Sequence, residues 1–210
     1  SAFVACMQNH DQVGNRPNSD RLAAILSPGA LRMSAALLLL SPCTPLLFMG
    51  EEFAAKTPFP FFCSFETPGL NGMVRRGRRI ELRNMHQLKR LKIADPGAEA
   101  TFETARLEWP DDDDIAAAQY RELYRRLLQL RRDIRPQSID RSHEVRLDES
   151  GVLTLEYRMK SSANTSGDNG RELPSVRIIV NLSEAPRPIA ADRLEGSLLL
   201  SSESAEFGGD

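Results

Sequence analysis

The residues best suited to chemistry are crowded into one short segment, residues 8–16. The segment reads Gln-Asn-His-Asp-Gln-Val-Gly-Asn-Arg and follows the apolar run Phe3–Met7, which predicts a buried strand. Barrel and open-sheet enzymes place their catalytic groups where a strand ends and a loop begins. Amide, imidazole, carboxylate and guanidinium groups together supply hydrogen-bond donors, acceptors and both signs of charge. We therefore expect this segment to bind a ligand covered in hydroxyl groups, such as a sugar.

Two side chains of the segment are candidate catalytic groups. Asp11 can accept hydrogen bonds from hydroxyl groups, and His10 can donate one. In a lone His-Asp pair, the Asp more often caps a turn and the His packs against its neighbours. Here the whole of residues 8–16 favours a catalytic role for the pair. Gly14 is expected to permit a backbone turn that other residues resist. Four neighbours are candidates for substrate binding: Asn9, Gln12, Asn15 and Arg16. Of these, Asn9 is expected to brace the loop rather than contact the substrate.

Composition and charge exclude several classes of protein. The 210 residues carry a formal net charge of -2, so no bulk electrostatic attraction to nucleic acid is expected. The three cysteines show no C-x-x-C spacing, which argues against a disulfide framework or a zinc site and fits a reducing cytoplasm. No metal-ligand spacing and no glycine-rich phosphate loop is visible in the sequence, so neither a metal nor a cofactor is expected.

The first half of the chain predicts a strand, a helix and a second strand. Residues 33–50 are uncharged and nearly long enough to span a membrane, but Pro42 and Pro45 would interrupt one continuous helix. A Ser-Pro pair instead predicts a helix start, with residues 29–40 helical and buried on several sides and residues 46–49 forming a buried strand. Two strands joined through a helix should be parallel, which predicts an α/β fold.

The middle of the chain predicts a long loop followed by two helices. Residues 56–71 are rich in Phe and Pro without periodicity, which predicts a loop at the top of the sheet. Residues 74–91 predict a basic helix, and residues 94–113 predict an excursion that holds the single tryptophan. An acidic cap at residues 111–114 begins a helix that runs to about Asp133, with apolar residues three and four apart.

After Pro136 the pattern changes from helical to extended. Four strands are predicted, the first two as a β-hairpin, at residues 144–147, 152–158, 176–182 and 197–200. Residues 161–172 are polar and rich in Gly, Ser and Asn, which predicts a mobile loop. We therefore expect two domains: residues 1–135 with parallel strands and helices, and residues 136–210 as a small, truncated antiparallel β domain.

The same residues carry a resemblance to a known family. An Asn-His-Asp at a strand end resembles the fourth conserved region of the α-amylase family of glycoside hydrolases, and all of residues 8–16 resembles its trehalohydrolases. Residues 45–52 resemble the eighth barrel strand and the turn after it. Further resemblances lie at residues 58–65, 75–79, 101–102, 107–109 and 180–183. Together they cover about residues 3–200 and the final portion of the family's length. Ser64 departs from the pattern, because an Asp is expected there.

The resemblance implies a fold and a mechanism. The fold would be the C-terminal part of a (β/α)8 TIM barrel, with residues 8–16 after strand seven, followed by an antiparallel β-sandwich. The mechanism would be retaining, with a nucleophilic Asp, a Glu acid/base and a second Asp that binds sugar hydroxyls. Asp11 matches the second Asp as a transition-state stabiliser, with His10 donating to a neighbouring hydroxyl. The other two acids would lie on earlier strands, so we expect the chain alone to be inactive.

The resemblance also implies an activity for the parent enzyme. It would hydrolyse the α-1,4-glucosidic bond next to the trehalose unit of maltooligosyl trehalose, releasing trehalose in the cytoplasm during trehalose biosynthesis. One alternative is another enzyme of the α-amylase family, an amylase or branching enzyme that acts on maltodextrin. The other is a non-catalytic carbohydrate-binding or interaction module in which residues 136–210 do the work. Neither nucleic acid nor a membrane is an expected partner.

Other conspicuous side chains are given structural roles. Glu51 and Glu52 form an adjacent acid pair, but consecutive residues leaving a strand point in opposite directions, so Glu52 is expected in the scaffold or at the rim. Three phenylalanines are expected to pack in the core rather than stack on sugar rings: Phe61, Phe62 and Phe65. The arginine run at residues 75–79 is expected to be solvated rather than to bind phosphate or nucleic acid.

Overall fold

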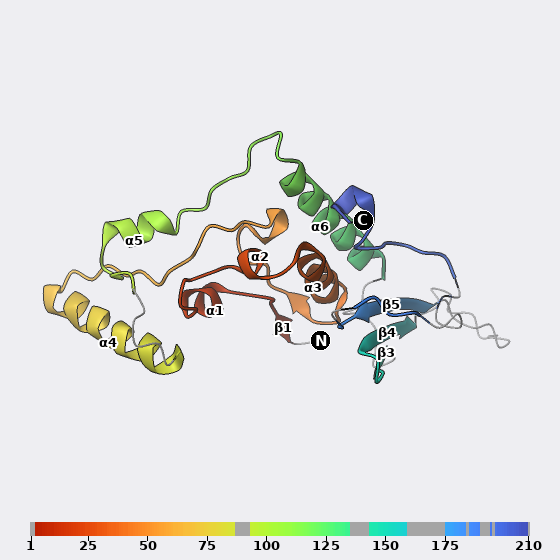
Figure 1. Ribbon diagram of the computed structural model, residues 1–210, viewed down its shortest axis with the longest axis horizontal. Helices are drawn as coiled ribbons and strands as arrows, with labels where there is room; N and C mark the ends of the chain where they lie inside the picture. Colours follow the sequence, from red (N-terminus) through yellow and green to blue (C-terminus); the bar gives the residue numbers. More distant parts are fainter. Residues whose placement is uncertain are drawn as a thin grey trace, which may run out of the picture. The chain divides into compact units, whose positions relative to one another are not determined.

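The computed structural model describes residues 3–86, 93–134, 143–158, 175–183, 185–189, 194 and 196–209 (Figure 1). The chain divides into two compact units. The strand unit comprises residues 1–5, 32–45 and 122–210, and the loop unit comprises residues 6–31 and 46–121. Two long helices begin in the loop unit and end in the strand unit: α3 (Pro28–Leu40) and α6 (Ile115–Ile134). No helix in the described ranges is long and apolar enough to cross a membrane.

The strand unit contains both predicted parallel strands and most of the helix between them. Strands β1 (Val4–Ala5) and β2 (Thr44–Pro45) are parallel, with Val4 opposite Thr44. The backbone N–H of Thr44 donates to the carbonyl of Phe3 at 2.9 Å. Helix α3 supplies the crossover that two parallel strands require. The parallel pairing and the α/β class are therefore confirmed.

Both strands are shorter and less buried than predicted. Phe3 and Val4 are exposed, so the run Phe3–Met7 is not a buried strand. The second strand lies at Thr44–Pro45 instead of residues 46–49, where Leu46, Leu47 and Met49 are exposed. An apolar run predicts burial on the assumption that neighbours cover it, and each of these strands has one hydrogen-bonded neighbour among the described residues. The extent and the burial of both predicted strands are therefore wrong.

The C-terminal turn of α3 is held by side chains of the strand unit. Its last carbonyl groups have no partner within the helix. Arg131 of α6 donates at 2.6–2.7 Å to three carbonyl oxygens in and after this turn: Leu39, Ser41 and Cys43. The hydroxyl of Tyr157 donates to the carbonyl of Leu40 at 2.8 Å, and burial raises the pKa of Tyr157 to about 12, so the hydroxyl keeps its proton. These bonds connect α3 to α6 and to the sheet.

The remaining strands form one antiparallel sheet in the order β3 (His143–Leu147), β4 (Val152–Arg158) and β5 (Ser175–Asn181). The predicted hairpin and the strand after it are confirmed. Gly151 closes the hairpin turn with a φ of +85°, a conformation that favours glycine. Residues 197–200 are not a strand in the described part, and Leu198 and Leu199 are exposed, so that prediction is wrong. An alternating pattern without a pairing partner does not make a strand. The predicted loop at 161–172 and the domain boundary near residue 135 lie outside the described residues.

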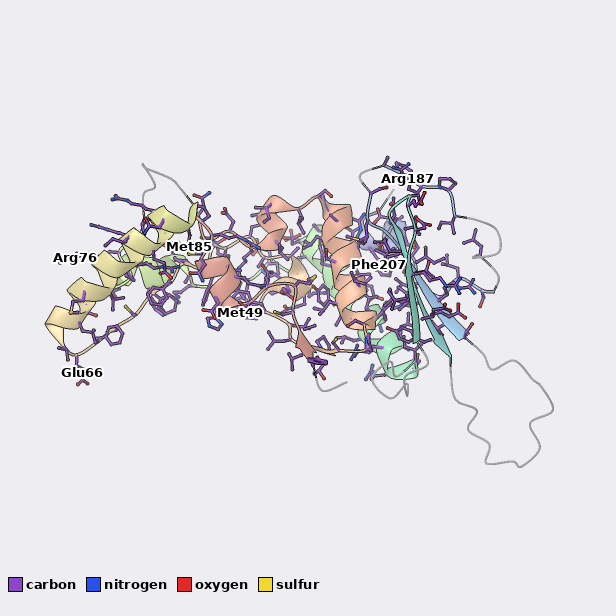
Figure 2. All side chains as sticks on the ribbon, turned by 90° about the horizontal axis from the view of Figure 1, so that it is seen from below. Met49, Glu66, Arg76, Met85, Arg187 and Phe207 are labelled. Atoms are coloured by element: carbon purple, nitrogen blue, oxygen red, sulfur yellow. The ribbon has the colours of Figure 1, made fainter. Side chains whose placement is uncertain are left out.

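The C-terminal residues add a small buried contact to the strand unit. The 3-10 helix η4 (Ala205–Phe207) buries the ring of Phe207, which is labelled in Figure 2. The buried guanidinium of Arg32 donates to the carbonyl of Gly208 at 2.9 Å and pairs with Glu203 at 2.6 Å. The two terminal nitrogens of this buried arginine thus find partners, whereas its buried Nε atom has no hydrogen-bond partner in the described residues.

The loop unit combines one 19-residue helix with several short helices and long connections. Its further elements are α1 (His10–Gly14), α2 (Leu22–Ile25), η1 (Glu51–Phe53), α4 (Pro68–His86) and α5 (Glu99–Thr104) (Figure 1). Helix α1 lies in the segment after the first strand that was expected to be a loop, and α5 lies within the predicted excursion at 94–113. Helix α4 begins at Pro68 rather than Val74. Helices as short as α1 and α5 hold too little periodicity to be recognised in a sequence. The acidic start of α6 is confirmed, since Asp114 accepts the N–H of Ala117 at 2.9 Å.

Candidate functional site

Helix α1 is held at its N-terminus by Asn9. The Asn9 backbone is extended, with a φ of -146°, and its side-chain oxygen accepts the N–H of Gln12 at 2.9 Å. Its amide nitrogen lies 3.8 Å from the sulfur of Cys6. Asparagine is among the most favourable residues at this capping position. These contacts give Asn9 the bracing role that the sequence favoured, and they place His10 and Asp11 in the first turn of a helix.

The side chains of His10 and Asp11 lie side by side in solvent. The His10 Nε2 atom is 3.5 Å from the Asp11 Oδ1 atom, and the two side chains are 69% and 76% exposed. An exposed carboxylate can accept hydrogen bonds from ligand hydroxyl groups, and the imidazole beside it can donate one. The pair is therefore accessible to a ligand.

The other predicted binding residues of this segment take different positions. Gln12 is exposed on α1. The backbone N–H of Asn15 donates to the carbonyl of Asp11 at 3.0 Å and closes the helix. Arg16 donates through Nη1 to the carbonyl of Asp20 at 2.6 Å, so this arginine braces the following turn. Gln12 is thus the most accessible of the three side chains.

Gly14 lies close to the backbone of residues 59–61 and not in a positive-φ turn. It ends α1 and is absent from the described glycines with positive φ, so the predicted turn role is wrong. A Cβ atom at this position would lie 3.4 Å from the carbonyl oxygen of Phe59 and 3.5 Å from the backbone nitrogen of Phe61. The backbone of residues 59–61 therefore packs directly against the end of α1.

Arg78 anchors α4 to the end of α1. Its Nη2 atom donates to the carbonyl oxygen of Gly14 at 2.6 Å, and its Nη1 atom donates to Glu81 at 2.8 Å. The guanidinium lies 5.2 Å from the ring centroid of Phe61. The side chain is 9% exposed, so the prediction that the whole arginine run is solvated is wrong for this residue. A run of like charges does not reveal which member faces a neighbouring loop.

Gln8 and Arg21 fix the backbone on either side of the polar segment. Gln8 is buried, and its side-chain oxygen accepts the N–H of Leu22 at 2.9 Å. Arg21 is fully buried and donates to the carbonyls of Thr57 and Met49 at 2.5 and 2.6 Å. Its guanidinium lies 4.6 Å from the ring centroid of Phe48. Arg21 therefore connects the start of α2 to the chain on both sides of η1.

Glu51 is a buried acid within this framework. Its residue surface is 5% exposed, and burial raises its pKa to about 7. Gln8, the backbone of Phe48 and the charge of Arg21 act in the opposite direction, although neither carboxyl oxygen has a described partner at ordinary hydrogen-bond geometry. Burial also lowers the pKa of Arg21, while the negative charges of Glu51 and Glu52 raise it. Near neutral pH, Glu51 therefore exists in both protonation states.

An open cavity of about 520 Å³ lies in the loop unit. Aromatic side chains form much of its wall, together with two charged residues: Phe59, Phe62, Phe102, Trp109, Glu52 and Arg106. Met49, labelled in Figure 2, is also part of the wall. Glu52 thus faces the cavity while Glu51 is buried, which fits the opposite directions expected of the two residues. Residues 8–16 are not among the described residues that form the wall.

The phenylalanine rings around the cavity pack on one another at their edges. Phe59 meets Phe48 at a centroid distance of 5.2 Å and Phe62 at 5.7 Å, and Phe62 meets Phe102 at 5.3 Å. Edge-to-face contacts of this kind are favourable beyond the area that they bury. Phe62 therefore packs as expected and also forms part of a wall. Phe61 and Phe65 are exposed, so the expectation of core packing is wrong for these two rings.

Three residues of this framework were not singled out individually by the sequence interpretation: Gln8, Arg21 and Arg78. Arg21 and Arg78 are charged, and nothing in the local pattern separates them from solvated arginines. Their importance comes from contacts with residues 28–64 positions away in the chain. Such contacts are decided by the tertiary fold.

Comparison with known proteins identifies close relatives along the chain. No family model matches it. The chain is 37% identical to a malto-oligosyltrehalose trehalohydrolase of Brevibacterium helvolum over 97% of its own length and 32% of the relative's. It is 38% identical to the enzyme of that name from Saccharolobus solfataricus over 62% of the chain and 21% of the relative. A solved structure from Salmonella typhimurium, assigned as an alpha amylase, is 30% identical and superposes with a TM-score of 0.73 over 94% of the chain and 32% of its own.

The chain thus spans about a third of the length of the curated relatives that match it along nearly all its residues.

Proposed function

Because this chain is a homologue of malto-oligosyltrehalose trehalohydrolases along nearly its whole length, we propose that it is part of a glycoside hydrolase that releases trehalose from maltooligosyl trehalose. The observation that carries the proposal is the state of residues 8–16. They come shortly after the parallel strand β1 and present His10 and Asp11 to solvent from a braced helix. A site that must grip a large hydroxylated substrate needs this combination of exposure and rigid support.

The finer fold in this proposal is the C-terminal part of a (β/α)8 barrel followed by an antiparallel sandwich. The parallel pair β1 and β2, joined through α3, supports the barrel portion. The antiparallel sheet β3-β4-β5 supports the sandwich portion. A complete barrel needs about 250 residues, so the rest of it would come from the remainder of the parent protein.

The roles in the site follow from the exposed groups. Asp11 accepts hydrogen bonds from the hydroxyl groups of the sugar at the cleaved bond, and these bonds strengthen as positive charge develops on that ring. His10 donates to a neighbouring hydroxyl group. Gln12 contacts an outer sugar, while Asn15 and Arg16 hold the segment against the substrate. The nucleophile and the acid/base belong to the remainder of the parent, so this chain alone hydrolyses nothing.

Substitution of Asp11 in the complete parent enzyme tests the proposal. We expect Asp11→Asn to lower kcat on maltooligosyl trehalose by about 100-fold or more, because a group that stabilises the transition state is lost. The matched control is Asp112→Asn, which makes the same change at an exposed residue of the loop before α6 and should leave kcat unchanged. Equal rates for wild-type enzyme and Asp11→Asn would overturn the assignment of Asp11.

A second candidate function is cleavage or transfer within plain maltodextrin. Its support is the likeness to the Salmonella typhimurium structure that is assigned as an alpha amylase, whereas the curated relatives carry the trehalohydrolase name. Release of trehalose from maltooligosyl trehalose, measured beside release of glucose and maltose from maltodextrin of equal length, separates the two. A parent enzyme that consumes only the plain maltodextrin would support the second candidate.

A further inference from the structure

The cavity of the loop unit exposes aromatic surface that packing does not use. Trp109 is 73% exposed although its ring lies 5.5 Å from the buried ring of Phe53, and Phe102 on α5 is half exposed. Large aromatic side chains that remain in solvent beside a hollow are a common mark of a binding site. The volume of about 520 Å³ falls within the range of small-molecule sites, roughly 300–1,000 Å³.

The chemistry of the wall suits a sugar ring. A pyranose has apolar faces formed by its C–H groups and a rim of hydroxyl groups. The four aromatic rings offer surfaces for those faces, and they come from two separated stretches, residues 59–62 and 102–109. The Glu52 carboxylate can accept hydrogen bonds from hydroxyl groups, and Arg106, held by Glu103 at 2.9 Å, can donate them. A purely apolar ligand would leave both charges unused.

The cavity also adjoins the helix that carries His10 and Asp11. Phe59 forms part of the wall, and its carbonyl oxygen lies 3.4 Å from the place that a Cβ atom of Gly14 would occupy. Gly14 is the last residue of α1. The same residue, Phe59, therefore forms part of the cavity wall and contacts the end of α1, which makes a sugar unit of the same substrate a reasonable ligand for the cavity.

We infer that the aromatic cavity lined by Phe59, Phe62, Phe102 and Trp109 binds an outer glucosyl unit of an α-1,4-linked glucan. The inference rests on the proposed function, because that function supplies the glucan. It goes beyond it by assigning residues of α5 and the following loop to substrate binding. These residues contact the substrate at a point remote from the bond that is cleaved. They therefore affect the affinity for the substrate rather than the chemical step.

Trp109 provides a direct test, because it is the single tryptophan of the chain. The 210-residue chain is titrated with maltotetraose, and its tryptophan emission and its quenching by iodide are recorded. We expect a saturable blue shift and protection from iodide, because a sugar ring over the indole excludes water and quencher. Trehalose at the same concentrations is the second probe and should give no change. An unchanged spectrum with maltotetraose, or a response to trehalose alone, overturns the inference.

Two variants locate the binding within the cavity without removing the reporter. We expect Phe102→Ala and Glu52→Gln each to weaken maltotetraose binding about tenfold, as the loss of a well-placed contact does. The matched controls are Phe65→Ala and Glu66→Gln, which change an exposed ring and an exposed carboxylate outside the wall. Circular dichroism of each variant verifies that its helices remain. Equal weakening by the control variants would refute a specific site.

Kinetics of the complete parent enzyme separate substrate binding from packing. Phe102→Ala should raise KM for maltooligosyl trehalose with kcat nearly unchanged, as expected when an interaction common to ground and transition state is lost. If the cavity instead receives another segment of the parent, the variant will lower Tm and leave KM unchanged. That result would refute the inference. The effect of Asp11→Asn on kcat would still test the proposed function independently.

Discussion

Glu51 shows how one buried residue can make stability depend on pH. Burial raises its pKa from 4.5 to about 7, so the folded chain keeps a proton on this carboxyl that the unfolded chain releases above its ordinary pKa. Between these two values the folded state binds more protons than the unfolded state. Stability therefore falls as pH rises from about 4.5 to about 7, and the loss is complete above that range. The shift corresponds to a free energy on the order of 3 kcal/mol at most.

Replacing Glu51 by Gln should remove this dependence. The amide has a similar shape and cannot ionise, so Glu51→Gln should lose less Tm than the wild-type protein between pH 5 and pH 8. Differential scanning fluorimetry of both proteins at the two pH values measures the difference, and other titrating groups cancel in the comparison. Glu66→Gln, an exposed carboxylate, is the control and should follow the wild type. Parallel curves for Glu51→Gln and wild type would show that Glu51 ionises normally.

Helix α4 contacts helix α1 through the guanidinium group of Arg78. Arg78 reaches the carbonyl of Gly14 from a position that is 9% exposed, with Glu81 and Phe61 holding it in place. A hydrogen bond from a charged donor in such a setting is worth about 1.5–3 kcal/mol. The bond restrains the C-terminal end of the short helix that carries His10 and Asp11. A five-residue helix has little stability of its own and depends on such contacts.

Removing this contact should loosen α1 without unfolding α4. We expect Arg78→Ala to speed amide hydrogen exchange in residues 8–16 by roughly 10- to 100-fold, in proportion to the free energy of the lost bond. Arg78→Lys should restore the protection partly, since lysine offers a charge without the planar fork. Arg76→Ala is the matched control, because Arg76 is an exposed arginine of the same helix (Figure 2). Unchanged exchange in Arg78→Ala would remove α4 from any role in positioning the site.

At the scale of the whole molecule, several large apolar side chains of the described residues are exposed at or near the ends of the strands. Phe3 and Val4 on β1, Leu46 and Met49 after β2, and Leu198 are all exposed. The strands β1 and β2 each pair with one neighbour in the described residues, and an unpaired strand edge invites association with other chains. In the proposed barrel, strands from the remainder of the parent protein would cover such surfaces.

We therefore expect the isolated 210-residue chain to self-associate. Its elution volume in size-exclusion chromatography should shift with concentration, and it should bind a hydrophobic dye more strongly than the complete parent protein does. A coexpressed remainder of the parent should suppress both effects. A monomeric profile together with a sharp cooperative thermal transition would contradict this expectation.

The alternation of elements and the candidate site segment could be predicted from local patterns. A helix at residues 28–40, an acid-capped helix ending near Asp133, and a hairpin around Gly151 each carry a strong periodic or turn signal. The extents of β1 and β2 could not be predicted, because a strand needs a partner. Short helices such as α1 and α5 could not be predicted either, because so few residues hold little periodicity.

The sequence by itself determined which side chains lie after the first strand. It also determined that the first and second strands are parallel. Only the tertiary structure decided that Glu51 is buried with a raised pKa, that Arg78 restrains Gly14, and that aromatic residues of two separate stretches share one cavity. The physical reason is range. Helix periodicity and turn chemistry act between near neighbours, whereas burial, charge pairing and cavity walls depend on residues that the fold brings together.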